Sequence, residues 1–160
     1  ALHGGQAGTA DSPHAMALLF ALDRHAAVGE LADLTRANDI VLLDRYVASN
    51  AAYTAARLGA ARAEEAIDWI DALEFDTLAL PVPDLQILLD TPVELAAERA
   101  GSREAQDPGR TRDRYERDRT LQSDTATAYR RLAEASWRSP WTVLGPQPDV
   151  PALVDLVVGT

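Results

Sequence analysis

The apolar residues of this chain follow two spacings, which predict helices and short buried strands. From Pro13 onward, leucine and alanine recur at intervals of three and four residues, and Ser12 before a proline is a typical helix start. We therefore expect one long helix over 13–37 that ends at Asn38. The same spacing predicts further helices over 47–57, over 60–78, from 92 onward, from the end of a loop at 100–111 to about 136, and over 151–158.

Continuous apolar runs predict three strands, at 40–43, 85–89 and 141–144. Each run is short and bounded by polar or turn residues, which is typical of strands buried on both faces of a parallel sheet. Because these runs alternate with helices, we expect an α/β fold in which helices cover both faces of a parallel sheet. Three strands are few for such a sheet, so we also expect at least one strand to be missing from this chain.

The composition narrows the classes of function. The 160 residues include 25 acidic and 15 basic side chains, and the resulting net charge of −10 argues against a general nucleic-acid binder. Every basic residue is an arginine and there is no cysteine, which excludes a Schiff-base lysine, a thiol nucleophile and a thiolate metal site. No apolar run is long enough to span a membrane and no secretory signal is visible. The length fits a single domain over 1–160, or a piece of one, and the acidic, cysteine-free composition leads us to expect a cytoplasmic protein.

Asp44 and Arg45 follow the first predicted strand directly. In open parallel sheets ligands bind beyond the carboxyl ends of the strands, where a carboxylate can serve a metal ion and a guanidinium can bind an anion. The alternative is a local ion pair that closes the turn. On position alone the two interpretations are about equally supported.

A second feature is the concentration of arginine around the loop at 100–111. The guanidinium binds phosphate through a fixed two-pronged geometry, so arginines on a glycine-containing loop can close over a polyphosphate. The alternative, a solvated helix with ion pairs between successive turns, explains Arg117 and Arg119 better than it explains the residues nearer the loop. The cluster comprises Arg99, Arg103, Arg110, Arg112, Arg114, Arg117 and Arg119.

Two further pairs have helical spacing. Phe20 and Arg24 share one face, where an aromatic ring and a guanidinium could stack on a base and bind its carbonyl, although core packing is the more common role of such a pair. Asn50 and Tyr53 share a face of the helix after Asp44-Arg45. Asn50 and Tyr53 are each weak evidence alone and gain weight beside Asp44-Arg45.

Three segments together resemble bacterial thymidylate kinase, a member of the nucleoside monophosphate kinases: residues 20–24 (FALDR), 44–53 (DRYVASNAAY) and 107–118 (DPGRTRDRYERD). The order and spacing of these segments match over nearly the whole chain. The resemblance implies a P-loop NTPase-like fold, transfer of the ATP γ-phosphoryl group to dTMP to give dTDP, a requirement for Mg²⁺, and a homodimer.

The resemblance also implies roles for the residues around dTMP. Phe20 would stack on the thymine ring and Arg24 would donate a hydrogen bond to a base carbonyl. Arg45 would hold the phosphate, and Asn50 would face the nucleotide. Tyr53 would pack against the deoxyribose and leave no room for a ribose 2′-hydroxyl.

On the ATP side, the resemblance implies a lid over about 98–110. Arg103 would stabilise charge on the transferring phosphoryl group, assisted on the ATP phosphates by Arg99 and Arg110. Asp44 would lie close to the acceptor and the metal. These roles agree with the chemistry, since phosphoryl transfer depends on positioning and on cancelling negative charge.

The resemblance further implies that Asp113 and Tyr115 contact dTMP and that Glu116 lies near the Mg²⁺ ion. The sequence departs from the family in one respect: it has no glycine-rich phosphate loop with its lysine. We expect this to reflect a missing N-terminal segment, leaving the chain alone inactive. The alternatives are a non-catalytic nucleotide-binding or dimerising module, and a helical scaffold whose arginines form only surface pairs.

Overall fold

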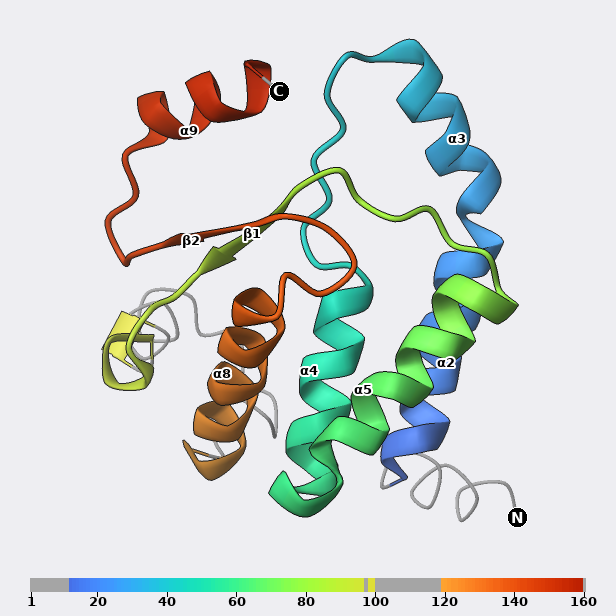
Figure 1. Cartoon of the computed structure of the whole chain (residues 1–160), viewed down its shortest axis with the longest axis vertical. Coiled ribbons are helices and arrows are strands. Elements are labelled where there is room, and N and C mark those ends of the chain that lie inside the picture. The colour runs from blue at the N-terminus through green and yellow to red at the C-terminus, as the bar shows by residue number, and fades with distance from the viewer. Residues whose placement is uncertain (1–11, 97, 100–118, 160) are drawn as a thin grey trace, which may run out of the picture.

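A computed structural model describes residues 12–96, 98–99 and 119–159 (Figure 1). It is rich in helix and contains one small sheet. The α-helices are α2 (Pro13–Ala26), α3 (Val28–Ala37), α4 (Val47–Leu58), α5 (Ala63–Asp71), α8 (Arg119–Glu134) and α9 (Val150–Val158). Two short segments adjoin α5, the 3₁₀-helix η1 (Ala60–Arg62) and the π-helix η2 (Ala72–Thr77), and residues 93–96 are also helical.

Several predicted elements are confirmed with their boundary residues. The Ser12 hydroxyl accepts a hydrogen bond from the Ala15 amide at 3.3 Å and so caps α2, whose first residue is a proline. Asp149 caps α9 in the same way, through the amide of Ala152 at 3.1 Å. Both caps satisfy backbone N–H groups that have no partner within the helix.

Helix α4 occupies the centre of the helical bundle, where it contacts α2, α5 and α8 (Figure 1). Its buried positions are mostly alanines, and Ala51, Ala52 and Ala55 are at most 1% exposed. Short side chains let helix axes approach closely, so the abundance of alanine is explained by packing. Larger apolar residues from the neighbouring helices complete the core, including Ile70 of α5 and Leu132 of α8.

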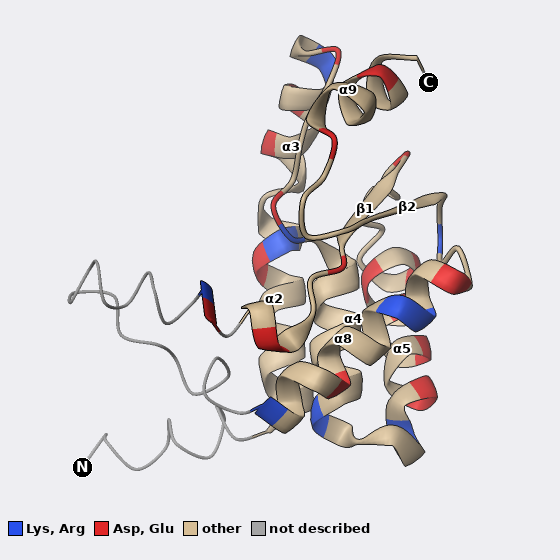
Figure 2. Cartoon of the chain, turned by 90° about the vertical axis from the view of Figure 1, so that its left-hand side faces the viewer, with Lys and Arg blue, Asp and Glu red and all other residues tan. Residues whose placement is uncertain are grey.

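The sheet consists of two parallel strands, β1 (Gln86–Leu89) and β2 (Trp141–Leu144), paired in register from Gln86 opposite Trp141 to Leu89 opposite Leu144. Figures 1 and 2 show the strands between α9 on one side and the helical bundle on the other. The side-chain amide nitrogen of Gln86, Nε2, anchors the start of β1 by donating hydrogen bonds to the Trp137 carbonyl and the Ser139 hydroxyl. Two of the three predicted strands are therefore confirmed.

The predicted strand at 40–43 is wrong: these residues form an irregular link between α3 and α4. Leu42 is 83% exposed and Ile40 is 51% exposed, so the run is not buried. A strand needs a neighbour for its backbone N–H and C=O groups, and within the described part of the chain β1 and β2 pair only with each other. The apolar pattern identified a strand-like segment but could not supply its partner.

Two predicted helices differ in detail from the observed ones. The expected helix over 13–37 is divided at Ala27, whose φ of −90° and ψ of 0° leave the helical region, and α3 continues beyond it. The expected helix over 60–78 changes type along its length, from 3₁₀ through α to π. Short π segments are rare and often occur at functional sites.

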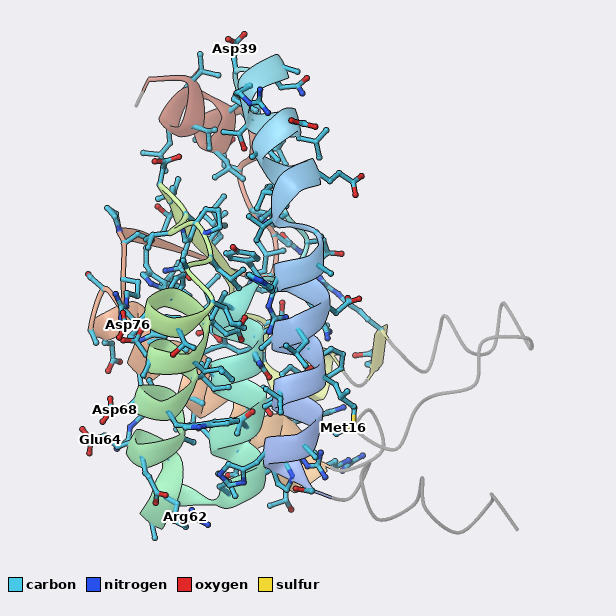
Figure 3. All side chains as sticks on the ribbon, turned by 90° about the vertical axis from the view of Figure 1, so that its right-hand side faces the viewer. Met16, Asp39, Arg62, Glu64, Asp68 and Asp76 are labelled. Carbon is cyan, nitrogen blue, oxygen red and sulfur yellow. The ribbon has the colours of Figure 1, made fainter. Side chains whose placement is uncertain are left out.

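Acidic and basic residues are scattered along the helices of the chain (Figure 2). Figure 3 shows Glu64, Asp68 and Asp76 on the outer side of α5 and η2, pointing away from the bundle. Within the described residues, no helix combines the length and apolar character needed to cross a membrane.

Candidate functional site

Three polar side chains meet inside the bundle and form what we call the carboxylate cluster: Arg24 of α2, Asn50 of α4 and Glu74 of η2. The Glu74 carboxylate accepts two hydrogen bonds from the Arg24 guanidinium, from Nε and Nη2, each at 2.6 Å. The Asn50 amide nitrogen donates to Glu74 Oε1 at 2.7 Å and to the Ala17 carbonyl at 2.9 Å. The cluster therefore joins three elements through charged and polar contacts.

Glu74 is completely buried, at 0% exposure, while the Arg24 side chain keeps 19%. A buried carboxylate is costly unless it is paired and hydrogen-bonded, and here both oxygens have partners. Removing one partner would leave a charge without compensation in the core. The cluster therefore joins a fully buried carboxylate to an arginine side chain that keeps partial exposure.

The sequence prediction identified Arg24 and Asn50 but missed Glu74. A signal was present in the chain: Ile67, Ile70 and Glu74 have helical spacing, which places an acid on the apolar face of the segment. Glu64, Asp68 and Asp76 of the same region point outward in Figure 3. An acid on the buried face predicts a buried partner, and spacing alone could not identify that partner as Arg24.

Phe20 lies one turn before Arg24 on the same face of α2, as the spacing predicted. Its side chain is 52% exposed, which is unusual for a phenylalanine and leaves much of its area accessible to a ligand. The neighbouring Ala17 and Ala21 are buried and hold this part of α2 against the bundle.

A second group lies at the start of α4 and is called here the Arg45 turn: Asp44, Arg45 and Tyr53. The Arg45 guanidinium carbon is 5.5 Å from the centre of the Tyr53 ring, a cation–π contact. Arg45 has a φ of 67°, in the left-handed region that residues other than glycine rarely adopt. Such strain is concentrated at ligand sites, and Asp44 and Arg45 are both exposed.

Neighbouring tyrosines support both groups. The Tyr129 hydroxyl of α8 is 2.6 Å from Ser49 Oγ, one residue before Asn50. Burial raises the pKa of the Tyr129 hydroxyl above its usual 10.0, and the hydrogen bond to Ser49 partly offsets this. Burial likewise raises the pKa of Tyr46, whose hydroxyl donates to the Pro81 carbonyl at 3.1 Å.

The structure brings Arg24 and Asn50 together at Glu74, with Phe20 one turn before Arg24 on α2, and it joins Arg45 to Tyr53. Arg99 lies elsewhere: its side chain is exposed and donates to the Pro146 carbonyl at 3.2 Å, between β2 and α9. The remaining predicted site residues are outside the described residues, as is most of the predicted lid at 98–110. They are Arg103, Arg110, Asp113, Tyr115 and Glu116.

Within residues 12–96, 98–99 and 119–159, no three His, Cys, Asp or Glu side chains are grouped so that they could hold a metal ion. Mg²⁺ in phosphoryl-transfer sites is held by one or two carboxylates together with substrate phosphates and water. An exposed carboxylate such as that of Asp44, next to an arginine, is compatible with that kind of site.

Comparison with known proteins decides the family. The family model for thymidylate kinase matches residues 5–151 of this chain. The chain belongs to the thymidylate kinase family. It is 51% identical to the thymidylate kinases of two strains of Mycobacterium tuberculosis, CDC 1551 / Oshkosh and H37Rv, over 93% of this chain and 70% of those proteins. It is also 38% identical to a probable thymidylate kinase 1 of Saccharolobus solfataricus, over 56% of this chain and 42% of that protein.

Proposed function

We propose that this protein is a thymidylate kinase that transfers the γ-phosphoryl group of ATP to dTMP and forms dTDP. The family match over residues 5–151 supports this activity and does not favour a non-catalytic module or a helical scaffold. One structural observation carries the assignment to a site. The segment 44–53 takes part in both groups of the site, because Arg45 lies at its start and Asn50 lies further along α4.

The proposed acceptor site extends from α2 to the start of α4. The exposed Phe20 ring stacks on thymine and Arg24 donates a hydrogen bond to a base carbonyl. Asn50, which binds the same Glu74 carboxylate as Arg24, also faces the base. Tyr53 packs against the deoxyribose and excludes a 2′-hydroxyl. Asp113 and Tyr115 complete the contacts to dTMP.

The dTMP phosphate is placed at Arg45. The N-terminus of α4 follows directly, and its partial positive charge adds to that of the guanidinium. Arg103, Arg99 and Arg110 act on the ATP side, where arginines of the proposed lid cancel charge on the transferring group. Asp44 and Glu116 are the carboxylates proposed near Mg²⁺, which would bind with the phosphates and draw negative charge from them.

Two broader features are also proposed. A three-layer α/β arrangement is supported by the parallel pairing of β1 and β2. A homodimer is supported by an apolar face of α2, on which Leu18, Leu19 and Leu22 are 41–52% exposed. Exposed apolar residues grouped on one element mark protein interfaces more often than isolated ones do.

The activity is tested with the protein expressed from its complete reading frame. Purified protein is mixed with ATP, Mg²⁺ and dTMP, and dTDP is separated from dTMP by anion-exchange chromatography. We expect dTDP to accumulate in proportion to enzyme and time, and to depend on both ATP and Mg²⁺. Binding of dTMP by calorimetry without any dTDP formation would overturn the kinase and favour the non-catalytic module.

A further inference from the structure

We propose that Glu74 is a positioning residue that makes this site select thymine over cytosine. It does so by fixing the Arg24 guanidinium and by setting the orientation of the Asn50 amide. The inference rests on the proposed function, because it assumes that the base lies against Arg24 and Asn50. The inference goes beyond that function by assigning a role to Glu74, a buried residue that contacts both base-binding side chains.

The orientation of Asn50 follows from its hydrogen bonds. The Asn50 amide nitrogen has two hydrogens, and it lies within hydrogen-bond distance of two acceptors, Ala17 O and Glu74 Oε1. An ionised carboxylate can only accept, so Glu74 forbids the flipped amide, in which an oxygen would face two acceptors. Asn50 can therefore offer a ligand only its carbonyl oxygen, an acceptor.

Arg24 is fixed by the same carboxylate. Its Nε hydrogen and one Nη2 hydrogen are used by Glu74, in a bidentate geometry that holds the plane of the guanidinium. The guanidinium has five N–H donors, so three remain for a ligand, and the group has no atom that can accept a hydrogen bond. Arg24 can therefore offer a ligand only donors.

The cluster thus presents one donor group and one acceptor. Thymine has a matching edge, because its O4 accepts and its N3–H donates. Cytosine carries an amino group in place of O4 and an unprotonated N3, so its pattern is reversed. A site whose polar groups are left unpaired by the wrong ligand discriminates strongly, because buried groups then lose hydrogen bonds that water would have supplied.

The surroundings hold this arrangement in place. Glu74 is 0% exposed and belongs to the π-helical segment η2, where the Leu78 amide bonds to Leu73 O and the Leu80 amide bonds to Glu74 O, both at 2.9 Å. Tyr46 lies close enough for the charges of Arg24 and Glu74 to influence its hydroxyl. The outward-pointing acids of the same helical region, such as Glu64 in Figure 3, share neither the burial nor these contacts.

The test is Glu74→Gln in the complete protein, with kcat and KM measured for dTMP and for dCMP. Glutamine keeps the size of the side chain but replaces one acceptor oxygen with a donor and removes the charge, so it cannot hold the Arg24 fork and the Asn50 amide together as the carboxylate does. We expect the ratio of kcat/KM for dTMP over dCMP to fall by about tenfold or more, mainly through a higher KM for dTMP. The control Glu64→Gln makes the same change on the outer side of α5 and should leave the ratio unchanged.

The outcomes separate the two proposals. If wild-type protein does not phosphorylate dTMP, the proposed function fails. If wild-type is active and Glu74→Gln lowers kcat/KM for both substrates by the same factor, Glu74 is only structural and the inference is overturned. If Glu74→Gln does not fold, as judged by circular dichroism, Glu74→Asp replaces it. Its carboxylate is one methylene shorter and should also lower the ratio, whereas an unchanged ratio would again overturn the inference.

Discussion

The two groups of the proposed acceptor site are built in opposite ways. In the carboxylate cluster, Glu74 is buried and its charge is already paired with Arg24. In the Arg45 turn, Asp44 and Arg45 are exposed, and Arg45 is held by a strained backbone and by the Tyr53 ring. The base-recognition side is therefore assembled before any ligand arrives, while the phosphate side keeps its charge in water.

This difference matches the two kinds of ligand chemistry. Selecting a base depends on the direction of hydrogen bonds, which needs donors and acceptors fixed by their neighbours. Binding a phosphate depends mainly on charge, which the exposed Arg45 supplies while it rests against the Tyr53 ring. A variant that disturbs one side of the site should therefore leave the other side unaffected.

The largest effect is expected for Arg45→Ala. The variant loses the charge proposed to bind the dTMP phosphate, and kcat/KM for dTMP should fall by about 10²–10³-fold. Arginine and alanine meet the same backbone strain at a φ of 67°, so the loss reports the guanidinium itself. Steady-state kinetics with dTMP varied at saturating ATP measure it.

The control for that variant is Arg36→Ala on α3, which removes an exposed arginine paired with Asp33. Surface pairs of this kind contribute little, so its kinetics should match wild-type. Unchanged kcat/KM in Arg45→Ala would remove Arg45 from the phosphate site. A change in the dTMP-over-dCMP ratio would show that the two sides of the site are not independent.

A smaller effect is expected for Tyr53→Ala, which opens space beside the proposed deoxyribose position. Discrimination between dTMP and the corresponding ribonucleotide should weaken by about tenfold, since shape alone carries that selectivity. Tyr53→Phe keeps the ring and should keep the discrimination. Equal selectivity in all three proteins would show that the 2′-position is read elsewhere.

The smallest effect is expected for Tyr129→Phe, which removes the hydroxyl that bonds to Ser49 behind the Arg45 turn. At neutral pH the variant should lose about 1 kcal/mol of unfolding free energy. In wild-type, the raised pKa of Tyr129 means that the unfolded chain releases its proton first. Stability therefore falls as the pH rises from 10.0, the unfolded value, through the higher folded pKa.

Urea denaturation at a series of pH values measures this. The difference between wild-type and Tyr129→Phe should shrink above pH 10.0, because phenylalanine has no proton to lose. Ser49→Ala loses the same hydrogen bond but keeps the titrating group, so its alkaline loss should remain. A constant difference between wild-type and Tyr129→Phe across the range would contradict the role assigned to burial.

Much of the fold followed from local patterns, and the failures came where long-range pairing decides. The cap at Ser12 and the strands at 86–89 and 141–144 were predicted because their signals are local. The run at 40–43 is at least as apolar as those strands, but among the described residues it has no strand to pair with. An apolar pattern reports only a preference for extended backbone, and a strand forms only where a second strand pairs with it.

The site shows the same limit. Spacing placed Phe20 with Arg24 and Asn50 with Tyr53, since each pair lies on one helix. The partner of Arg24 and Asn50 is Glu74, which comes from a third segment and an uncommon helix type. No rule of helical spacing brings those segments together, so the residue that organises the base-binding side could be found only in three dimensions.

The parallel pairing of β1 with β2 also bears on how the chain folds. Its partner residues are far apart in the sequence, and α8 lies between the strands along the chain. Joining distant segments costs more loop-closure entropy than packing α4 against its sequence neighbour α5. The α4–α5 contact is thus a local, fast-forming part of the molecule, whereas the sheet and the packing of α8 against α4 both join distant segments and slow its completion.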